Sequence, residues 1–187
     1  MTRIIGGLAG GRRIDAPRGL STRPSSDRVR EALFSAVESW CGSLQGLRFL
    51  DLYAGSGAVG LEAWSRGAGV VTLVEQNRRT ATLISANARL IGFSKAHVVA
   101  APVAATLLRP PSAPYDVVFL DPPYPTPADE VDDNLKLLGV DWLVPGAMVV
   151  VERSSRTRPP VFPDGFSEGR ERKYGETTLW YGHAARA

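Results

Sequence analysis

Short apolar runs rich in β-branched residues alternate along this chain with segments of helical length. The runs suited to buried strands are Arg48–Tyr53, Val70–Glu75, His97–Ala100, Tyr115–Leu120 and Ala147–Glu152, with Thr177–Tyr181 as a closing strand. The segments with helical patterning between them are 58–67, 77–91, 102–109 and 128–139. Strands that are separated by helices run parallel in one sheet, and the helices cover both of its faces. The alternation therefore predicts an α/β fold with a doubly wound, mostly parallel sheet.

The N-terminal part of the chain precedes this alternation. Residues 3–15 contain two β-type runs around a glycine-rich turn, which predicts a hairpin, and residues 16–26 have the composition of a linker. A helix is expected from Asp27, as its N-cap, to Gly42. Because 187 residues suit one domain, we divide the chain into a basic hairpin extension, 1–20, and one domain, 21–187.

The net charge of +3 is distributed unevenly. Residues 1–30 contain seven arginines and two aspartates, which gives +5, whereas the other 157 residues contain 15 basic and 17 acidic side chains, which gives −2. Because arginine pairs with phosphate through two hydrogen bonds, the N-terminal arm is predicted to bind a polyanion such as a nucleic acid. The alternative is a solvated arm, and we expect the arm to contribute little to the core. The arginines assigned to the substrate are Arg3, Arg12, Arg13 and Arg23.

Two other sets of basic residues have two interpretations each. Arg28 and Arg30 either belong to the same surface or are ordinary charges on the outside of the first helix. A second cluster, near the C-terminus, either extends the RNA-binding surface or forms a charged loop. Its members are Arg153, Arg156, Arg158, Arg170, Arg172 and Lys173.

Residue usage argues against several classes of protein. A single cysteine, Cys41, excludes an internal disulfide, and two histidines give no recognisable zinc-ligand spacing. The apolar runs are shorter than a bilayer-spanning helix requires. We expect a cytoplasmic protein that uses neither a membrane nor a metal.

A glycine-rich loop follows the first strand of the alternation. Gly55, Gly57 and Gly60 satisfy the G-x-G-x-x-G pattern of dinucleotide-binding proteins, and Glu75 ends the next strand, where a carboxylate binds ribose hydroxyls. Asp51 distinguishes the cofactors, because an extra carboxylate repels a pyrophosphate but complements the positive charges of S-adenosylmethionine. The alternative for Asp51 is a strand-end aspartate that is paired within the protein. The residues assigned to the cofactor are Asp51, Ala54, Gly55, Ser56, Gly57, Glu75 and Asp121.

A second motif, Asp121-Pro122-Pro123-Tyr124, ends the fourth strand and predicts a stiff loop at the carboxyl edge of the sheet, where ligands bind. Asp121 and the Pro122 carbonyl are predicted to accept the two N–H bonds of an amino group on a planar base, while Tyr124 stacks on the ring. These three residues are the candidate catalytic residues, and Pro123 and Tyr124 are also assigned to the substrate. The alternative is a proline-stiffened turn with a core tyrosine.

Taken together, these motifs resemble those of the RsmD family. The resemblance covers nearly the whole chain, through Arg3–Arg13, Thr22–Phe34, Asp51–Gly57, Val74-Glu75, Phe119–Tyr124 and Tyr174–Leu179. It implies a Rossmann-like class I methyltransferase with a seven-stranded sheet, which transfers a methyl group from S-adenosylmethionine to the N2 amino group of one guanine in 16S rRNA. It also implies a substrate within the 30S subunit or an assembly intermediate, and a further cofactor or substrate element at Arg23 and Ser25. We expect a monomer.

One departure from the family concerns the third strand. Similar proteins carry an aspartate after this strand, where it helps to hold the adenine amino group, whereas this chain has Pro102. No adenine-specific side chain is therefore assigned.

Other functions stay open at this point. The same tetrapeptide also serves enzymes that methylate adenine N6 in DNA or RNA, and enzymes that methylate protein amides. A non-catalytic RNA-binding module and an NAD-dependent dehydrogenase are further alternatives, against which the presence of Asp51 and Asp121 argues. The chemistry expected is a direct displacement, in which positioning and electrostatics lower the barrier.

Overall fold

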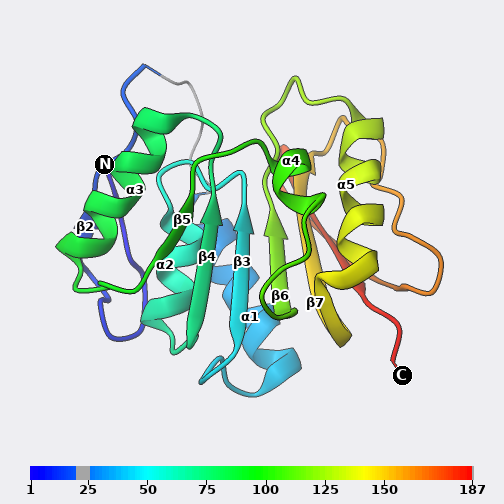
Figure 1. Cartoon of the computed structure of the whole chain (residues 1–187), viewed down its shortest axis with the longest axis horizontal. Helices are drawn as coiled ribbons and strands as arrows, with labels where there is room; N and C mark the ends of the chain where they lie inside the picture. Colours follow the sequence, from blue (N-terminus) through cyan, green and yellow to red (C-terminus); the bar gives the residue numbers. More distant parts are fainter. Residues whose placement is uncertain (20–25, 187) are drawn as a thin grey trace.

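A computed structural model describes residues 1–19 and 26–186. One sheet of seven strands, in the order β5-β4-β3-β6-β7-β9-β8, forms its centre (Figure 1). The strands are β3 (Arg48–Leu52), β4 (Val70–Val74), β5 (His97–Val99), β6 (Tyr115–Leu120), β7 (Leu143–Ser154), β8 (Ser167–Tyr174) and β9 (Thr177–His183). The first five strands in this order are parallel neighbours, whereas β9 is antiparallel to both β7 and β8. The predicted doubly wound, mostly parallel sheet is confirmed.

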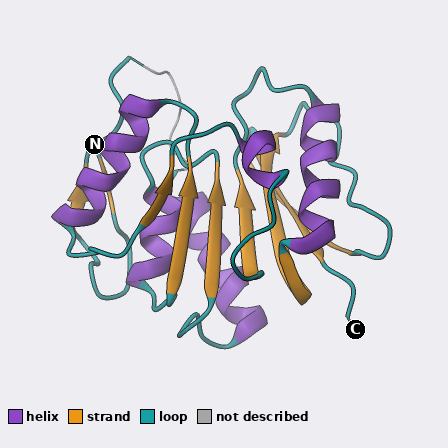
Figure 2. Cartoon of the chain, in the orientation of Figure 1, coloured by secondary structure: helices purple, strands orange, loops and turns teal. Residues whose placement is uncertain are grey.

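Helices cover both faces of this sheet, as Figure 2 shows. The helices are α1 (Asp27–Cys41), α2 (Ala58–Ser65), α3 (Arg78–Leu90), α4 (Val103–Leu107) and α5 (Ala128–Asp141). Leu33 of α1, Leu61 of α2 and Ile84 of α3 belong to one buried cluster. Val103 of α4 and Leu135 of α5 belong to a second cluster. The two clusters are the two halves of the core, separated by the sheet.

The order of the strands reverses at β3. This central strand pairs with β4 on one side and with β6 on the other, and Leu52 lies opposite Leu120. The loops that follow β3 and β6 therefore leave the same edge of the sheet side by side. In open α/β sheets, ligands bind in the crevice at this reversal.

Helix α1 begins one residue earlier than the sequence predicts. Its N-cap is Ser26, whose hydroxyl accepts a hydrogen bond from the Val29 amide at 3.2 Å. The expectation that Asp27 is the N-cap is therefore wrong. Asp27 is the first helical residue, where its negative charge interacts favourably with the positive N-terminal end of the helix dipole. The helix stops at Gly42 as predicted, with a positive φ of 76°.

The N-terminal arm forms the predicted hairpin, with the short strands β1 (Thr2–Arg3) and β2 (Arg13–Ile14). Ile4, Ala9 and Ile14 are only 0%, 3% and 1% exposed, and they belong to the same cluster as the cores of α1, α2 and α3. The expectation that the arm contributes little to the core is therefore wrong, because its apolar side chains are buried against the domain. The boundary predicted at residue 20 lies outside the described residues and stays a prediction.

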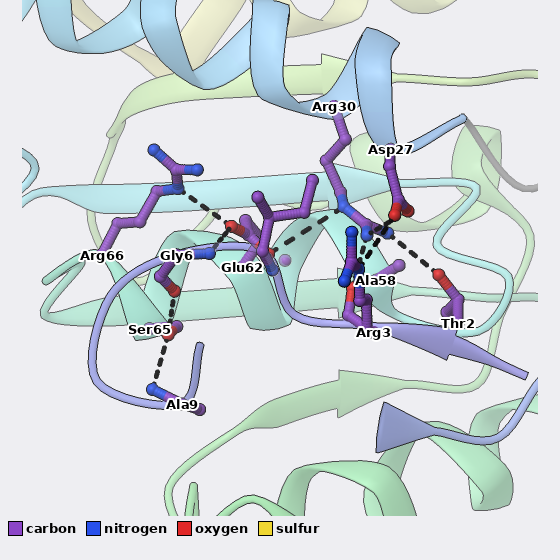
Figure 3. Close-up of polar contacts among 12 residues, drawn as sticks. Thr2, Arg3, Gly6, Ala9, Asp27, Arg30, Ala58, Glu62, Ser65 and Arg66 are labelled. Carbon is purple, nitrogen blue, oxygen red and sulfur yellow. Dashed lines mark hydrogen bonds and ion pairs between the residues drawn. The ribbon is translucent and has the colours of Figure 1, made fainter. Parts of the chain in front are cut away.

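Polar contacts attach the arm to α2, as Figure 3 shows. The Glu62 carboxylate, which is fully buried, accepts the Ile5 amide at 2.8 Å and the Gly6 amide at 2.9 Å. Ser65 Oγ accepts the Ala9 amide at 2.8 Å and donates to the Gly6 carbonyl at 2.6 Å. Side chains of α2 therefore supply hydrogen-bond partners for backbone groups of the arm, which would otherwise be left unpaired next to the core.

Among the described residues, Arg30 is the largest fully buried side chain, so both interpretations of it, as part of the basic surface and as an ordinary charge on the outside of the helix, are wrong. Its Nη2 donates to the Arg3 carbonyl and, at 3.2 Å, to Asp27 Oδ1, while its Nε lies 3.9 Å from Glu62 Oε2. Burial lowers the pKa of this guanidinium, although Glu62 and Asp27 oppose the change. A buried charge is tolerated only where it is paired, and these partners supply the pairing.

The strands near the C-terminus differ most from the prediction. β7 begins at Leu143, four residues earlier than expected, because Pro145 and Gly146 are accommodated within the strand. The sequence does not predict β8, since its charged residues show no apolar alternation. β8 is an edge strand of the sheet, where charged side chains are common because they discourage pairing with other chains. In the described residues, none of the helices has the length and apolar character that a membrane-spanning helix needs.

Candidate active site

The loop between β3 and α2 has a strained and glycine-dependent backbone. Tyr53, Gly55 and Gly57 have φ values of 62°, 57° and 83°. A Cβ built on Gly60 lies 2.6 Å from Leu73 Cδ2, so a side chain at this position of α2 would displace the buried Leu73 side chain of β4. A Cβ built on Gly55 meets no atom within 4 Å, so the space over Gly55 is open to a ligand.

Asp51 lies beneath this loop. Its Oδ2 accepts the Gly60 amide at 2.8 Å, and only 1% of its surface is exposed. Burial raises the pKa of Asp51 to about 7, and the nearby charge of Glu75 adds to this, whereas the Gly60 hydrogen bond opposes it. Asp51 is therefore paired within the protein, with the Gly60 amide, as the alternative interpretation of this residue expected. The contact of Asp51 with a cofactor stays a prediction.

Glu75 follows β4 and reaches back to the glycine loop. Its Oε2 accepts the Gly55 amide at 3.0 Å, and its Oε1 accepts the Asn77 amide at 2.9 Å. The loop is also held by backbone bonds, from the Ala54 amide to the Val74 carbonyl and from the Gly57 amide to the Ala54 carbonyl. A partly exposed carboxylate at this strand end is suited to accept hydrogen bonds from a pair of ligand hydroxyls.

Asn87 of α3 joins the loop to the N-terminal arm, and sequence reasoning missed it. Its Nδ2 donates to the Ser56 carbonyl at 3.0 Å and to the Asp15 carbonyl at 2.8 Å. Its Oδ1 accepts the Asp15 amide at 2.9 Å, and the side chain is 1% exposed. A lone asparagine on a helix carries no signal of such partners in a single sequence.

The loop after β6 presents the second motif at the same edge. The Asp121 amide donates to the Leu52 carbonyl at 3.3 Å, which keeps the end of β6 beside the end of β3. Pro122 is buried and Pro123 is exposed, while Tyr124 is 75% exposed. The alternative of a core tyrosine is therefore wrong, and the Tyr124 ring is accessible to a flat ligand.

Arg153 of β7, which the sequence analysis assigned to the basic cluster near the C-terminus, contacts this second loop instead. It follows Val151, the partner of Leu120, by two residues, and its Nη2 donates to the Thr126 carbonyl at 2.9 Å. The side chain is only 6% exposed, so it is not part of a surface cluster. Burial lowers the pKa of Arg153, and the neighbouring Tyr53 and Asp121 oppose this.

Tyr53 connects the first loop to α5. Its hydroxyl accepts a hydrogen bond from Asn134 Nδ2 at 2.7 Å. Burial and the neighbouring charge of Glu130 raise the pKa of Tyr53 to about 12, so the hydroxyl is neutral. A non-glycine residue with positive φ is held there by its surroundings, and here Asn134 supplies a specific contact.

The residues assigned to RNA on the arm lie apart from the two loops. Arg3 Nε donates to Asp27 Oδ2 at 3.1 Å, and Arg12 Nη2 donates to the Leu90 carbonyl at 2.7 Å. Arg3, Arg12 and Arg13 are all exposed. Arg23 and Ser25 lie outside the described residues. In residues 1–19 and 26–186, no group of three or more histidine, cysteine or acidic residues could hold a metal ion.

Pro102, the departure from the family, ends the turn before α4. It is the N-cap residue of that helix, and its carbonyl accepts the Thr106 amide at 3.1 Å. The position therefore offers no side-chain acceptor to a ligand at the end of β5.

The sheet has five parallel strands, followed by β9 and β8, which are antiparallel to each other. The strand order reverses between β3 and β6, at the edge where ligands bind. This is the topology of a class I methyltransferase. The solved structure of the Escherichia coli protein yhhF has the same fold. It aligns with a TM-score of 0.86 and 31% sequence identity, over 99% of this chain and 98% of that one.

The family follows from the sequence comparisons. The family model described as "Conserved hypothetical protein 95" matches residues 2–183, so the chain belongs to that family. Ribosomal RNA small subunit methyltransferase D of Escherichia coli K12 is 36% identical over 179 residues, which cover 93% of this chain and 85% of the relative. The protein of the same name from Haemophilus influenzae is 34% identical, over 92% of this chain and 89% of the relative. The resemblance to the RsmD family is confirmed.

Proposed function

We propose that this protein transfers a methyl group from S-adenosylmethionine to the N2 amino group of one guanine in 16S rRNA. The observation that carries the proposal is the juxtaposition of two loops. The glycine loop after β3 and the Asp121–Tyr124 loop after β6 leave the sheet at paired positions, Leu52 and Leu120. The relatives at 36% and 34% identity bear the name of an rRNA methyltransferase, which supports RNA as the substrate.

The residues around the glycine loop fit S-adenosylmethionine better than a dinucleotide. The open space over Gly55 is bordered by Glu75, and buried Asp51 lies below the same loop. Two carboxylates favour a ligand with positive charges and ribose hydroxyls, and they disfavour a pyrophosphate. The cofactor supplies an electrophilic methyl group. Glu75 would bind the ribose hydroxyls, and Asp51 would favour the cationic end of the ligand.

The second loop would bind and orient the base. Asp121 and the Pro122 carbonyl would accept the two N–H bonds of the guanine amino group, while the exposed Tyr124 ring stacks on the base. The lone pair of this nitrogen is delocalised into the ring, so the two acceptors would make it more available by favouring a pyramidal nitrogen. After the nitrogen–carbon bond forms and the sulfur–carbon bond breaks, the amino group releases one proton to Asp121 or to water. Catalysis then rests on positioning and electrostatics.

The N-terminal arm would hold the RNA outside the active site. Arg3, Arg12 and Arg13 are exposed, and their guanidinium groups can pair with phosphates. We propose that the substrate is 16S rRNA within the 30S subunit or an assembly intermediate, and that the enzyme acts as a monomer.

Methyl transfer from labelled S-adenosylmethionine to 30S particles that lack the modification tests this function. The expected product is a single guanine methylated on N2, mapped in the rRNA after digestion. Label on an adenine, or on a ribosomal protein, would contradict the proposed substrate. NAD measured by calorimetry beside S-adenosylmethionine is the matched control for the cofactor, and we expect binding of S-adenosylmethionine alone.

A further inference from the structure

A groove of about 520 Å³ runs between α1 and the outer strands of the sheet. Its α1 wall consists of small residues on one face of the helix, Ala32, Ser35, Ala36 and Ser39, and its other wall comes from β8 and β9. A second hollow, of about 380 Å³, adjoins it and shares Trp40 and His183. Volumes of this size hold ligands as large as a nucleotide. The groove is separate from the two loops of the candidate active site.

One of the residues that line this groove, Tyr181, has a buried hydroxyl without a partner among the described residues. Tyr181 is only 7% exposed, and within the described residues its hydroxyl has no hydrogen-bond partner. Burial and the nearby Tyr174 raise the pKa of Tyr181 to about 12, whereas the charges of Arg170 and Arg172 oppose this. Buried polar groups in native proteins are nearly always paired, and each unpaired one needs an explanation. A bound group that accepts this hydrogen bond supplies one.

The charge of the groove is positive. Arg170 and Arg172 line it and are exposed, and none of the described residues that line either hollow is acidic. Among the described residues, no ion pair involves Arg170 or Arg172. In contrast, Arg156 lies 3.5 Å from Glu176, and Arg158 lies 2.6 Å from Asp129. Within the basic cluster near the C-terminus, Arg156 and Arg158 therefore pair with acidic residues of the protein. Arg170 and Arg172 are available to bind an external anion.

Arg170 lines the groove together with residues of α1 and lies within an irregular part of β8. The pairing of β8 with β9 shifts in register between Glu168 and Glu171, and such a bulge changes the direction of a side chain. Gly169 lies within this bulge, and a Cβ built there would be 2.4 Å from the Tyr181 carbonyl oxygen. Glycine is therefore required for β8 to approach β9 this closely beside the groove.

One end of the groove lies toward the edge of the sheet that carries the candidate active site. Tyr174, at one end, pairs with Thr177, which pairs with Ser154 at the carboxyl end of β7. His183, at the other end, pairs with Met148 at the opposite end of the shared register. The groove thus leads along the sheet toward the edge from which the Asp121 loop leaves. Arg28, in the first turn of α1, lies 6.0 Å from the Tyr174 ring at this end.

We propose that the groove between α1 and β8–β9 binds a single-stranded segment of the substrate RNA, with phosphates on Arg170 and Arg172 and an acceptor on the Tyr181 hydroxyl. This inference rests on the proposed function. Unpaired arginines and flat rings beside a floor of small residues suit nucleotides, whose phosphates and bases need these two kinds of contact. Trp40 and His183, with ring centroids 5.8 Å apart, supply flat surfaces at the far end.

The test measures binding of unmodified 16S rRNA transcript at several salt concentrations. Arg170→Ala with Arg172→Ala is expected to weaken binding about tenfold or more and to reduce the log–log salt slope by about 0.7 for each phosphate that is no longer paired. The matched control is Lys95→Ala with Arg109→Ala, which removes the same charge from exposed positions outside the groove. The control is expected to stay within about twofold of wild type. Affinity for S-adenosylmethionine is expected to be unchanged in both variants.

Tyr181→Phe gives a second variant that keeps the packing of the ring. Because the hydroxyl has no partner within the described residues, we expect no fall in Tm but RNA binding that is weaker by several fold. Equal RNA affinity of the groove double variant and its control would overturn the proposal. Weaker binding to reconstituted 30S particles, with unchanged binding to the transcript, would also overturn it, since the occupant would then be a ribosomal protein. Failure of the wild type to methylate 16S rRNA would instead contradict the proposed function.

Discussion

Asn87 donates a hydrogen bond from Nδ2 to the Ser56 carbonyl of the glycine loop at 3.0 Å. The same side chain makes two hydrogen bonds to the backbone of Asp15 in the N-terminal arm. One buried amide thus fixes the loop that would bind the cofactor and the hairpin that would bind RNA. The arm is therefore a support for the active site as well as a basic surface.

The first prediction concerns this amide. Asn87→Ala leaves the Ser56 carbonyl and the Asp15 backbone with fewer partners, and each unsatisfied buried group costs about 1–3 kcal/mol. We expect a lower free energy of unfolding in urea and weaker binding of S-adenosylmethionine by calorimetry. Ser85→Ala, on the same helix, is the control, because the Ser85 hydroxyl bonds only within α3. Wild-type affinity and stability in Asn87→Ala would contradict the coupling.

The second prediction separates the two roles of the arm. Deletion of residues 1–15 exposes the core beside Ile4 and Ile14 and removes two donors to the buried Glu62, so Tm and cofactor affinity are both expected to fall. Triple replacement of Arg3, Arg12 and Arg13 by alanine keeps those backbone donors. It is expected to lower RNA affinity and flatten the salt slope, by about 0.7–0.9 for each phosphate that loses its arginine, with little change in Tm. A deletion variant that melts like wild type would argue against the structural role.

The third prediction is a pH dependence at Asp51. Burial raises the pKa of this carboxyl from 3.8 to about 7, so between these values the folded state holds a proton that the unfolded state releases. The contribution of Asp51 to stability is therefore complete below pH 3.8 and decreases as the pH rises through about 7.

Cofactor affinity should change in the opposite direction, since a cationic ligand favours the ionised carboxylate. Affinity for S-adenosylmethionine is expected to increase as the pH rises through about 7, and Asp51→Asn is expected to flatten this profile. Calorimetry on both proteins at several pH values measures it. If the affinity of the wild type depends on pH in the same way as that of Asp51→Asn, the charge of Asp51 does not contribute to cofactor binding.

The fourth prediction assigns a positioning role to Arg153. Arg153→Met removes the hydrogen bond to the Thr126 carbonyl and the positive charge near Asp121. We expect kcat to fall by about tenfold or more, since hydrogen bonds from charged groups are worth about 1.5–3 kcal/mol, while S-adenosylmethionine affinity stays near wild type. Arg153→Lys is expected to recover part of kcat. Equal loss in both variants, accompanied by a lower Tm, would indicate a structural role only.

The fold was predictable where burial dictates the sequence pattern. β3, β4 and β6 are mostly buried and consist mainly of apolar residues, so their predicted ends lie within one residue of the observed ones. β8 was missed because an edge strand exposes charged side chains and lacks that pattern. Both interpretations of Arg30 were wrong because its partners, Arg3 and Glu62, lie on other elements.

The site was predictable where its residues follow strands directly along the chain. The ends of β3, β4 and β6 meet at one edge, which brings the loops of Gly55, Glu75 and Asp121 to the same side of the sheet. Asn87 was missed and Arg153 was wrongly assigned to a basic cluster, because their hydrogen bonds go to backbone carbonyls of distant segments. Such acceptors have no signature in a single sequence.

The fifth prediction concerns Asp121, the residue on which the proposed chemistry depends. Asp121→Ala is expected to abolish most methyl transfer and to leave S-adenosylmethionine affinity within a few fold, because its partner is the amino group of the base. Tyr124→Phe is expected to have a mild effect and Tyr124→Ala a larger one, since stacking requires the ring and not the hydroxyl.

Single-turnover methyl transfer to unmodified 30S particles, measured beside cofactor affinity for wild type and Asp121→Ala, tests the account most directly. We expect one N2-methylated guanine in the wild-type reaction, and a large loss of rate in Asp121→Ala with nearly unchanged cofactor binding. Normal turnover by Asp121→Ala would contradict it.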